Sequence, residues 1–399
     1  MNAEHAKSDA RSGPLAGIRV LDLGVMVSSP FATRAMADLG AEIIKVEAFE
    51  GDPQRAGGGL KPGGNPTAIF ASVQRNRLGV AVDLKKPEGA RVVLDLARRS
   101  DVVVANFRPG VAARLGVDYK SLSAENPNLI YCSITGFGED GPLSNVPVTD
   151  GVIQAFAGVL ELTGTGGTFG HPFKVVIADQ IAGATACQAI LGALVGRQVD
   201  GRGRKIDISM LDCMLSWLHT ATRFDVAGPS STTFLLEASD GRHVLVQCPL
   251  HFEERFIGLI VGQPGFEHLA SDERFTSRKK RAENRQQYVE AVQGAFKSMT
   301  AAQWLEKLAT ASIPAAEAHR VAEALNHPVV SGRGCLAEMH VNDTLSFTMV
   351  RSPFVIDGVR CGEVGPPPWV GQHTDQVLAS VAGYTRQEID GLRQREVVR

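Results

Sequence analysis

The sequence lacks most of the patterns by which membrane, metal and nucleic-acid proteins are recognised. It contains no uninterrupted apolar run of about 18 residues, so we expect no membrane-spanning helix and no membrane partner. Its ten histidines show no HExxH or HxxxH spacing and its acids form no ligand cluster, so we expect no metal site. A net charge of −2 argues against nucleic acid as a partner, although it is compatible with a local basic pocket for a phosphorylated small molecule.

The cysteines and the opening segment argue for a cytoplasmic location. Six scattered cysteines form no CxxC pair. The polar segment 1–14 carries acids among its bases and fits neither a secretory signal nor a transit peptide. We therefore expect reduced thiols in a cytoplasmic protein, most of them small core residues.

Several nucleotide and hydrolase motifs are also missing. There is no P-loop and no GxSxG elbow. The first predicted βαβ unit invites a dinucleotide interpretation, because Glu47 ends its second strand. Its first turn, "GVMVSSP", lacks the glycines that let a backbone approach a pyrophosphate, so a nicotinamide oxidoreductase is disfavoured. Glu47 is then expected to be a carboxylate at the surface or at an interface.

The composition is that of an ordinary α/β protein. Apolar residues make up 44% and charged residues 21% of the chain, with 42 glycines. Apolar runs alternate with helical patterns over the first third of the chain, which predicts a doubly wound parallel sheet. Strands are expected at 18–24, 41–47, 79–84, 101–107 and 128–134, with helices at 28–40 and 87–99 between them.

The length of 399 residues exceeds what one core usually holds, so two domains are expected. A helix at 210–224 leads to "AGPSS" at 227–231, the clearest linker signal. A hairpin follows around Asp240-Gly241, and then come helical segments at 252–262, 280–298 and 300–311. The pattern predicts a large domain over 1–225, a smaller α+β domain over 230–330, and a linker with C-terminal helices over 331–399 that returns to the large domain.

Asp179 stands out within "KVVIADQIAGATA" (174–186). The segment begins as an apparent buried strand and continues as a helix of small residues, so the carboxylate is expected at their junction. The free N–H groups of a helix start favour the ionised form, whereas the apolar approach disfavours it. Two interpretations remain open on the residues alone: a plain N-cap aspartate, or a desolvated nucleophile with room for a bulky ligand beside it.

Arginines after predicted strands suggest a phosphate site. Arg75 and Arg77 precede one strand, while Arg108 and Arg114 follow another within "NFRPGVAARLG". Ligands of open α/β sheets bind beyond the carboxyl ends of the strands, so these guanidinium groups are candidates to meet phosphates there. Solvated surface arginines are an equal alternative.

Taken together, these segments closely resemble the class III coenzyme A transferases, a CaiB/BaiF-like family that also contains the α-methylacyl-CoA racemases. The resemblance covers nearly the whole chain. The stretches that carry it include "QRNRLGVAVDLKKPEG" (74–89), "NFRPGVAARLG" (106–116), "GFGEDGP" (136–142), "VIADQIAGATACQAILGALVGR" (176–197) and "VGQHTDQVL" (370–378).

The resemblance implies a fold and an activity. It implies a Rossmann-like large domain, a smaller domain on long linkers, and two chains interlocked as a homodimer. It also implies an enzyme of the CoA-transferase type that moves coenzyme A from an acyl-CoA donor to a free carboxylic acid, with no permanently bound cofactor. Asp179 is implied as the covalent nucleophile, through an aspartyl mixed anhydride and an aspartyl-CoA thioester.

By motif position, the resemblance also implies which residues bind CoA: Met26, Val27, Arg75, Asn106, Phe107, Arg108 and Arg114. Val27, Ala48 and Thr135 stand where formyl-CoA transferase has glutamine, arginine and lysine, so formyl or oxalyl transfer is not specifically expected. The glycine-quartet loop of that enzyme is not found after the linker. The identities of donor and acceptor cannot be read from the residues.

Two alternatives follow from the same resemblance. An α-methylacyl-CoA racemase needs a histidine opposite the aspartate to return the proton, and this chain has Thr149 at that position. Because threonine does not titrate in the required range, racemisation is the less favoured activity. A non-catalytic CoA-binding protein is the other alternative, and the presence of Asp179 argues against it.

Overall fold

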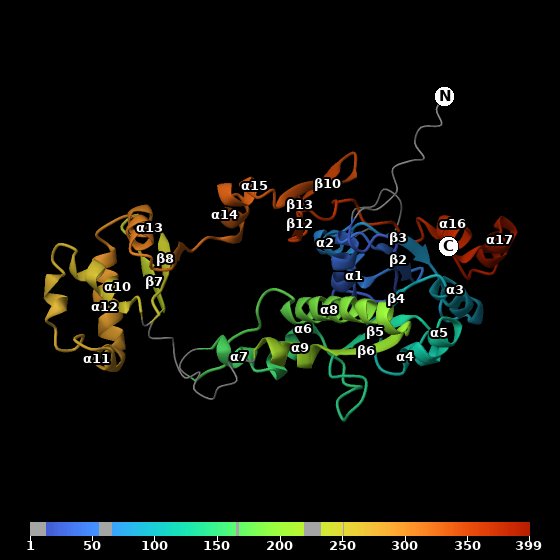
Figure 1. Ribbon diagram of the computed structural model, residues 1–399, viewed down its shortest axis with the longest axis horizontal. Coiled ribbons are helices and arrows are strands. Elements are labelled where there is room, and N and C mark those ends of the chain that lie inside the picture. The colour runs from blue at the N-terminus through green and yellow to red at the C-terminus, as the bar shows by residue number, and fades with distance from the viewer. Residues whose placement is uncertain (1–12, 56–65, 165–166, 219–232, 250) are drawn as a thin grey trace. The chain divides into compact units, whose positions relative to one another are not determined.

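The computed structural model describes residues 13–55, 66–164, 167–218, 233–249 and 251–399 (Figure 1). The chain divides into two compact units. The first combines Met1–Phe224 with Ser331–Arg399, and the second is Asp225–Val330. The predicted linker at 227–231 lies outside the described residues, as does the opening segment 1–12.

The first unit is built on a six-stranded sheet in which every neighbouring pair is parallel. The strand order is β3-β2-β1-β4-β5-β6. The central parallel sheet predicted from the sequence is therefore confirmed. The chain moves outward from β1 to β3 and then crosses back, so β1 and β4 are neighbours at the point where the strand order reverses, which is where such sheets bind ligands. In sheet order, the strands are Leu78–Ala81, Glu42–Glu47, Arg19–Asp22, Val102–Ala105, Ile130–Thr135 and Arg204–Ser209.

Helices cover both faces of this sheet (Figure 1). One apolar cluster joins the sheet to α1 (Ser28–Asp38), α6 (Asp150–Phe156), α8 (Ile177–Asp200) and α9 (Met210–Trp217). The other joins the opposite face to α3 (Pro87–Ala97), α5 (Tyr119–Glu125) and α17 (Arg386–Gln394). The core is dominated by fully buried Val, Ile and Leu from the strands, as expected for a parallel sheet covered on both faces.

α8 and α1 pack closely. A Cβ atom added at Gly183 would lie 2.6 Å from the carbonyl oxygen of Ser28, so only glycine fits at this crossing. By length and composition alone α8 could cross a membrane. Eight of its residues are nevertheless buried against α1, α9 and the sheet, which is the packing of a core helix.

The C-terminal segment packs on the edge of the sheet beside β3. The backbone N–H of His373 donates to the carbonyl of Gly79 at 2.8 Å, and His373 Nδ1 accepts the N–H of Gly79 at 3.0 Å. The stretch 331–372, expected as a connector, holds two hairpins. Its elements are β10 (Leu336–Asn342), β11 (Leu345–Val350), β12 (Val355–Ile356) and β13 (Val359–Arg360), followed by α16 (Thr374–Val377) and a π-helical turn (Leu378–Ala382).

Among the described residues, the first unit also includes the short helices α2 (Ala68–Gln74), α4 (Val111–Arg114) and α7 (Val159–Leu162) and the 3-10 turn η1 (Pro53–Arg55). The helix predicted at 210–224 is α9, which ends at Trp217, and residues 219–224 lie outside the described residues.

The second unit has its own core. The predicted hairpin around Asp240-Gly241 is confirmed, since β7 (Thr233–Glu237) and β8 (His243–Gln247) pair antiparallel, with β9 (Ala315–Glu317) beside β8. Phe296 and Trp304 stack in the core with ring centroids 4.3 Å apart. Helices α10 (Glu253–Val261), α12 (Arg285–Phe296) and α13 (Ala301–Thr310) contribute to the apolar core with the sheet. The unit also includes α11 (Arg278–Glu283) and α14 (Val321–Leu325), and α15 (Pro328–Gly332) begins at its end.

Candidate active site

Asp179 lies in the first turn of α8 and does not cap it. The strand expected over 174–178 is absent, because Lys174 and Val175 form an exposed bend beyond the sheet and α8 begins at Ile177. Val176 is the N-cap residue, and no side chain caps the helix. The apolar residues of this segment belong partly to an exposed loop and partly to the first turn of α8. A short apolar run alone does not distinguish this arrangement from a strand. The N-cap interpretation of Asp179 is therefore wrong.

The carboxylate of Asp179 meets the N-terminus of a second helix. Ser28, the first residue of α1, faces this carboxylate with its backbone N–H and its hydroxyl. Burial, and then the charge of Asp150, raise the pKa of the Asp179 carboxyl group from 3.8 to about 6, although the two polar groups of Ser28 lower it. The group is thus ionised at neutral pH but poorly hydrated, which makes it a stronger nucleophile or base than a solvated aspartate.

Asp150, the first residue of α6, holds the backbone at Asp179. Its Oδ2 accepts the Asp179 N–H at 3.0 Å, and its Oδ1 accepts a hydrogen bond from Gln154 Nε2. The side chain of Asp150 is buried. Sequence reasoning looked at this segment only for a histidine at Thr149, which is the N-cap residue of α6, and missed Asp150. The available signal was an acid in the first turn of a helix with a glutamine four residues later.

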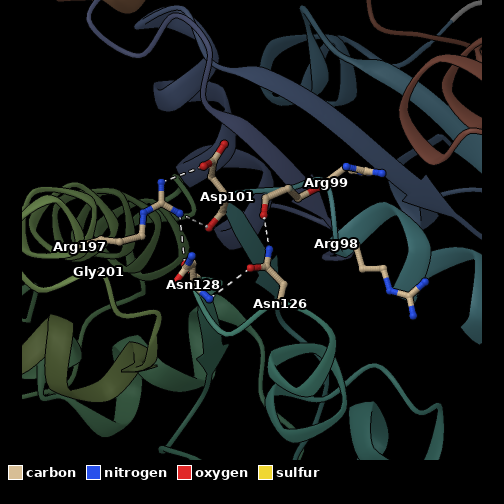
Figure 2. Close-up of a pocket in the computed structure, with 8 residues that line it drawn as sticks. Arg98, Arg99, Asp101, Asn126, Asn128, Arg197 and Gly201 are labelled. Carbon is tan, nitrogen blue, oxygen red and sulfur yellow. Dashed lines mark hydrogen bonds and ion pairs between the residues drawn. The ribbon is translucent and has the colours of Figure 1, made fainter.

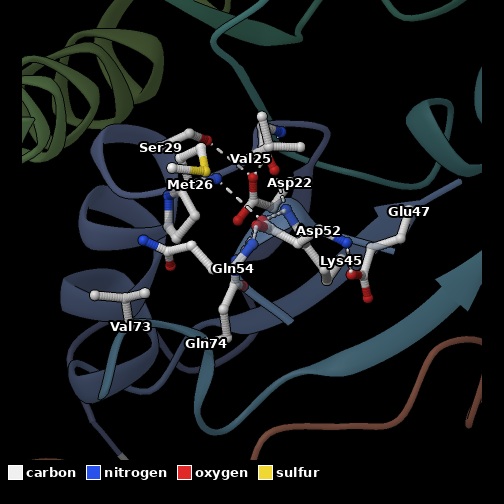
Figure 3. Close-up of polar contacts among 12 residues, drawn as sticks. Asp22, Val25, Met26, Ser29, Lys45, Glu47, Asp52, Gln54, Val73 and Gln74 are labelled. Atoms are coloured by element: carbon white, nitrogen blue, oxygen red, sulfur yellow. Dashed lines mark hydrogen bonds and ion pairs between the residues drawn. The ribbon is translucent and has the colours of Figure 1, made fainter. Parts of the chain in front are cut away.

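The loop from β1 to α1 (residues 23–27) carries two of the predicted CoA-binding residues. Met26 has a side chain that is 44% exposed and a backbone φ of +64°, in the left-handed region. Val27 is buried, so only its backbone can face a ligand. Figure 3 shows this loop above a buried group of charged side chains that includes Asp22, Lys45 and Asp52.

Asn106 ties this loop to the end of β4, across the point where the strand order reverses. Its Oδ1 accepts the Val25 N–H at 2.9 Å, and its Nδ2 donates to the Val25 carbonyl at 2.8 Å and to Ser28 Oγ at 3.1 Å. Asn106 was predicted as a CoA-binding residue. The structure shows its amide engaged in holding the backbone that presents Ser28 to Asp179.

Two hollows flank Phe107 at the carboxyl edge of the sheet. One, of about 280 Å³, is lined by residues 46–52 and 82–85 together with Leu23, Val25, Phe107 and Leu115. The other, of about 350 Å³, is lined by Arg108, Lys120, Lys205 and the aromatic rings of Tyr119 and Tyr131, among others. The sequence indicated Phe107 and Arg108 as ligand-binding residues, but it did not indicate 49–52 or 82–85, which follow β2 and β3.

The predicted phosphate-binding arginines separate into two groups. Arg75 is buried, and its guanidinium donates to both carboxylate oxygens of Asp38, at 3.0 and 3.2 Å. Arg77 is likewise buried and donates to Asp22 at 2.8 Å. The assignment of Arg75 to a phosphate is therefore wrong, because its charge is already paired in the core. Arg108 and Arg114 are exposed, and Arg114 is the last residue of α4.

Glu47 is also buried, contrary to the surface position expected for it. Its carboxylate accepts hydrogen bonds from Arg55 Nε at 2.8 Å and Nη2 at 2.7 Å. A buried, bidentately paired carboxylate is not free to bind a ribose hydroxyl.

A third hollow, of about 450 Å³, lies at the opposite edge of the sheet, before the starts of β4 and β5 (Figure 2). Arg197 pairs with Asp101 at 2.8 Å, and Arg98 pairs with Asp95 and Glu125. This hollow lies at the amino ends of β4 and β5, opposite the carboxyl edge where ligands of such sheets bind, and its Arg98 and Arg197 are already paired with carboxylates. Across the described residues, no group of three or more His, Cys, Asp or Glu side chains is arranged to hold a metal ion.

The fold and the site define an enzyme class with a carboxylate at its centre. A poorly hydrated aspartate stands in the first turn of α8 and faces the N-terminus of α1, the helix that follows β1. Two hollows lined by other residues lie at the carboxyl edge of the same parallel sheet. Such a carboxylate suits covalent or acid–base catalysis on a ligand bound along that edge.

Comparison with known proteins gives the family. The sequence model of CoA-transferase family III matches residues 15–374, and the chain belongs to this family. The chain is 31% identical to the succinate–glutarate CoA-transferase of Agrobacterium fabrum, over 93% of this chain and 96% of that protein. It is 32% identical to the acetyl-CoA:oxalate CoA-transferase of Acetobacter aceti, over 81% and 85% of the two chains.

A solved structure has the same fold. The crystal structure of a CAIB/BAIF family protein from Brucella suis superposes with a TM-score of 0.80 at 29% identity, covering 92% of this chain and 99% of that chain. The protein is thus a mixed α/β enzyme of the transferase type, and CoA thioesters are substrates of its family.

Proposed function

We propose that this protein transfers coenzyme A from an acyl-CoA donor to a free carboxylic acid, with Asp179 as the covalent nucleophile. The observation that carries the proposal is the position of Asp179. Its carboxylate is half-buried and ionised at neutral pH, and it faces Ser28 on the segment that follows the carboxyl end of β1, the side on which such sheets bind ligands.

The chemistry conserves one activated acyl bond at every step. An Asp179 oxygen attacks the donor's thioester carbon, and the C–S bond breaks to give a mixed anhydride and CoA thiolate. The thiolate attacks the aspartyl carbon of the anhydride, which releases the donor's free acid and leaves an aspartyl-CoA thioester. The acceptor carboxylate then attacks this thioester, and its C–S bond breaks to give CoA thiolate and a second mixed anhydride, between Asp179 and the acceptor. The thiolate attacks the acceptor's carbonyl carbon in this anhydride, which releases the acceptor's CoA thioester and regenerates the Asp179 carboxylate. Because each bond broken is replaced by one of similar energy, no external energy source is required.

The two helix N-termini have a defined task in this scheme. Negative charge develops on the carbonyl oxygen in each addition step, and free N–H groups at a helix start can stabilise it without reorganisation. Ser28 supplies one such N–H beside Asp179. As the carboxylate becomes an acyl group, its charge is lost, and the Ser28 N–H becomes available to the new oxyanion.

We place the CoA moiety along the carboxyl edge of the first unit, which we propose as the CoA-binding domain. The 280 Å³ hollow has apolar side chains such as Phe49 and Phe107 that can contact the adenine ring. Its charged lining residues are Lys85 and four acids, Glu47, Glu50, Asp52 and Asp83, so we place the adenosine there and the phosphates outside it. Arg108 and Arg114 are exposed on the segment that follows Phe107 and are candidates for the phosphates. The pantetheine arm would then pass Met26 to reach Asp179. No permanently bound cofactor is required.

Two further features belong to the proposal. Exposed apolar side chains on the α6, α8 and α9 side of the first unit, such as Phe156, Val199 and Trp217, support burial against a second copy in an interlocked homodimer. The near-neutral net charge and the free cysteines are compatible with a cytoplasmic enzyme.

The acceptor class is suggested by the relatives. Both curated transferases named above carry dicarboxylates in their names, succinate and glutarate in one and oxalate in the other. We propose a dicarboxylic acid as the acceptor. Racemisation is disfavoured, because Thr149 occupies the position where a second titrating group is needed.

The test is a transfer assay with defined partners. Succinyl-CoA and acetyl-CoA are each incubated with glutarate, succinate and oxalate, and the CoA esters are separated by liquid chromatography. We expect new acyl-CoA from at least one pair with the native enzyme and none with Asp179→Ala. Asp212→Asn is the control, since Asp212 holds the same first-turn position in α9 but is exposed. Transfer by Asp179→Ala at the native rate would refute the nucleophile, and deuterium wash-in at the α-carbon of a 2-methylacyl-CoA without transfer would identify a racemase.

A further inference from the structure

The turn formed by Gly24, Val25 and Met26 is held by side chains at almost every backbone polar group. The Gly24 N–H donates to Asp22 Oδ1 at 2.9 Å, and the Gly24 carbonyl accepts from Lys45 Nζ. Both polar groups of Val25 bond to one amide side chain, as described above. The Met26 N–H donates to Asp52 Oδ2 at 3.0 Å. A loop fixed in this way has little freedom to change conformation.

Met26 is the strained residue of this turn. Its φ of +64° lies in the left-handed region, which residues with a Cβ adopt at a cost and glycine adopts freely. Backbone strain of this kind persists only where the surroundings enforce it. The group that contacts the Met26 backbone is Asp52, so this carboxylate is the evident source of the constraint.

Asp52 is itself fixed and buried. Its Oδ1 accepts the Gln54 N–H at 2.9 Å, its Oδ2 accepts from Gln74 Nε2 at 3.1 Å, and Lys45 Nζ lies 3.9 Å from Oδ2. The Asp52 and Lys45 side chains are both fully buried. Figure 3 shows them side by side beneath the turn. Because Lys45 also donates to the Gly24 carbonyl, one buried ion pair holds both ends of the turn. Burying two charges is costly, so their retention beneath a ligand-facing loop points to a positioning task.

The turn leads directly into Ser28, which packs against the first turns of α8, since a Cβ added at Gly183 would lie 2.6 Å from the Ser28 carbonyl oxygen. The N–H and hydroxyl of Ser28 face the Asp179 carboxylate and lower its pKa. Ser28 follows Met26 by two residues, so a change in backbone direction at Met26 would displace the Ser28 N–H from Asp179. We propose that Asp52 is a positioning residue for the catalytic site: its buried carboxylate holds Met26 in the left-handed conformation and thereby fixes the Ser28 N–H against Asp179. This inference deepens the proposed function and rests on it for its catalytic meaning.

A conformational rescue tests this proposal. If Asp52 acts by enforcing the left-handed conformation at residue 26, Met26→Gly should reduce the need for Asp52, because glycine adopts this conformation without a steric penalty. Four proteins are compared: native, Asp52→Ala, Met26→Gly and the double variant. We expect Asp52→Ala to lower kcat/KM for CoA transfer by about 30-fold or more in the native background and at least about threefold less in the Met26→Gly background.

A matched control separates this effect from general loss of stability. Asp38 is also a buried carboxylate paired with an arginine, and the described contacts place it away from the turn. Met26→Gly should not reduce the loss caused by Asp38→Ala. If Asp52→Ala does not fold, the isosteric Asp52→Asn replaces it in the same cycle. Equal losses from the Asp52 variant in both backgrounds, or an equal rescue of Asp38→Ala, would overturn the proposal.

A second measurement needs no turnover. The titration of Asp179 is followed by 13C NMR of protein labelled at aspartate carboxyl carbons, with Asp179→Asn assigning the signal and Asp150 as the facing charge. Loosening the Ser28 N–H should raise the pKa of Asp179 in Asp52→Ala, and by less in the double variant. An unchanged pKa in Asp52→Ala would contradict the positioning role. If no acyl-CoA and acid pair supports transfer by the native enzyme, the proposed function fails, and this titration still decides the role of Asp52.

Discussion

The negative charge of Asp179 should lower the free energy of unfolding. A variant that cannot carry this charge should therefore be more stable than the native enzyme. The pKa of this group is raised from 3.8 to about 6, so the folded state binds the proton more tightly than the unfolded chain. The stability that the protonated group provides is fully present below pH 3.8 and is lost as the pH rises through about 6. The shift corresponds to about 3 kcal/mol at neutral pH and to about half of that near pH 5.

Asp179→Asn removes this cost, because the amide cannot ionise but can still accept from Ser28. We expect the variant to lose CoA transfer and to unfold at a temperature several degrees higher than the native enzyme at about pH 7.5. The difference should shrink as the pH falls toward about 5. Differential scanning calorimetry at one fixed protein concentration measures both.

Asp212→Asn is the control for this stability measurement. It removes an exposed carboxylate from the first turn of α9, so it should give no stabilisation at any pH and a slight loss from the helix dipole. The reasoning is refuted if Asp179→Asn is no more stable than the native enzyme at about pH 7.5, or if its gain does not depend on pH.

Three further predictions follow from the site. Arg75→Ala should destabilise the fold by about 3–5 kcal/mol, because it leaves the buried Asp38 carboxylate unpaired. Arg114→Ala should leave the melting temperature unchanged and raise the KM for acyl-CoA. A raised KM with unchanged stability in Arg75→Ala would instead support Arg75 as a phosphate ligand. Gly183→Ala should separate α8 from α1 and lower both stability and kcat. Gly192→Ala on the same helix, where nothing lies within 4 Å of the added Cβ, should be neutral or stabilising. Equal effects of the two variants would exclude the close crossing of α8 and α1. Asp150→Asn should move the acid limb of the kcat/KM profile to lower pH, since it removes a charge that raises the pKa of the nucleophile, and a shift to higher pH would contradict this.

The parallel sheet could be predicted because its signal is local. Buried strands such as β4 are continuous apolar runs, and helices with an apolar stripe separate them. The hairpin at Asp240-Gly241 has a turn sequence that specifies it. The segment before Asp179 was misassigned because a short apolar run has the same letters in a strand and in the first turn of a buried helix.

The site was only partly predictable, because pairing in three dimensions decides what each charged residue does. The local sequence does not distinguish Arg75, which pairs with a buried aspartate, from Arg108, which is exposed. Asp52 and Asp150 act through backbone N–H groups from distant segments, 26 and 29 residues away in the chain. Such partners become visible only when the fold brings those segments together.

The most direct measurement is mass spectrometry of the enzyme mixed with an acyl-CoA donor and quenched in acid. We expect a covalent CoA adduct on the peptide that contains Asp179, which disappears when the acceptor acid is added and is absent from Asp179→Asn. An enzyme that transfers CoA while this peptide stays unmodified, or that carries the adduct on another residue, would contradict it.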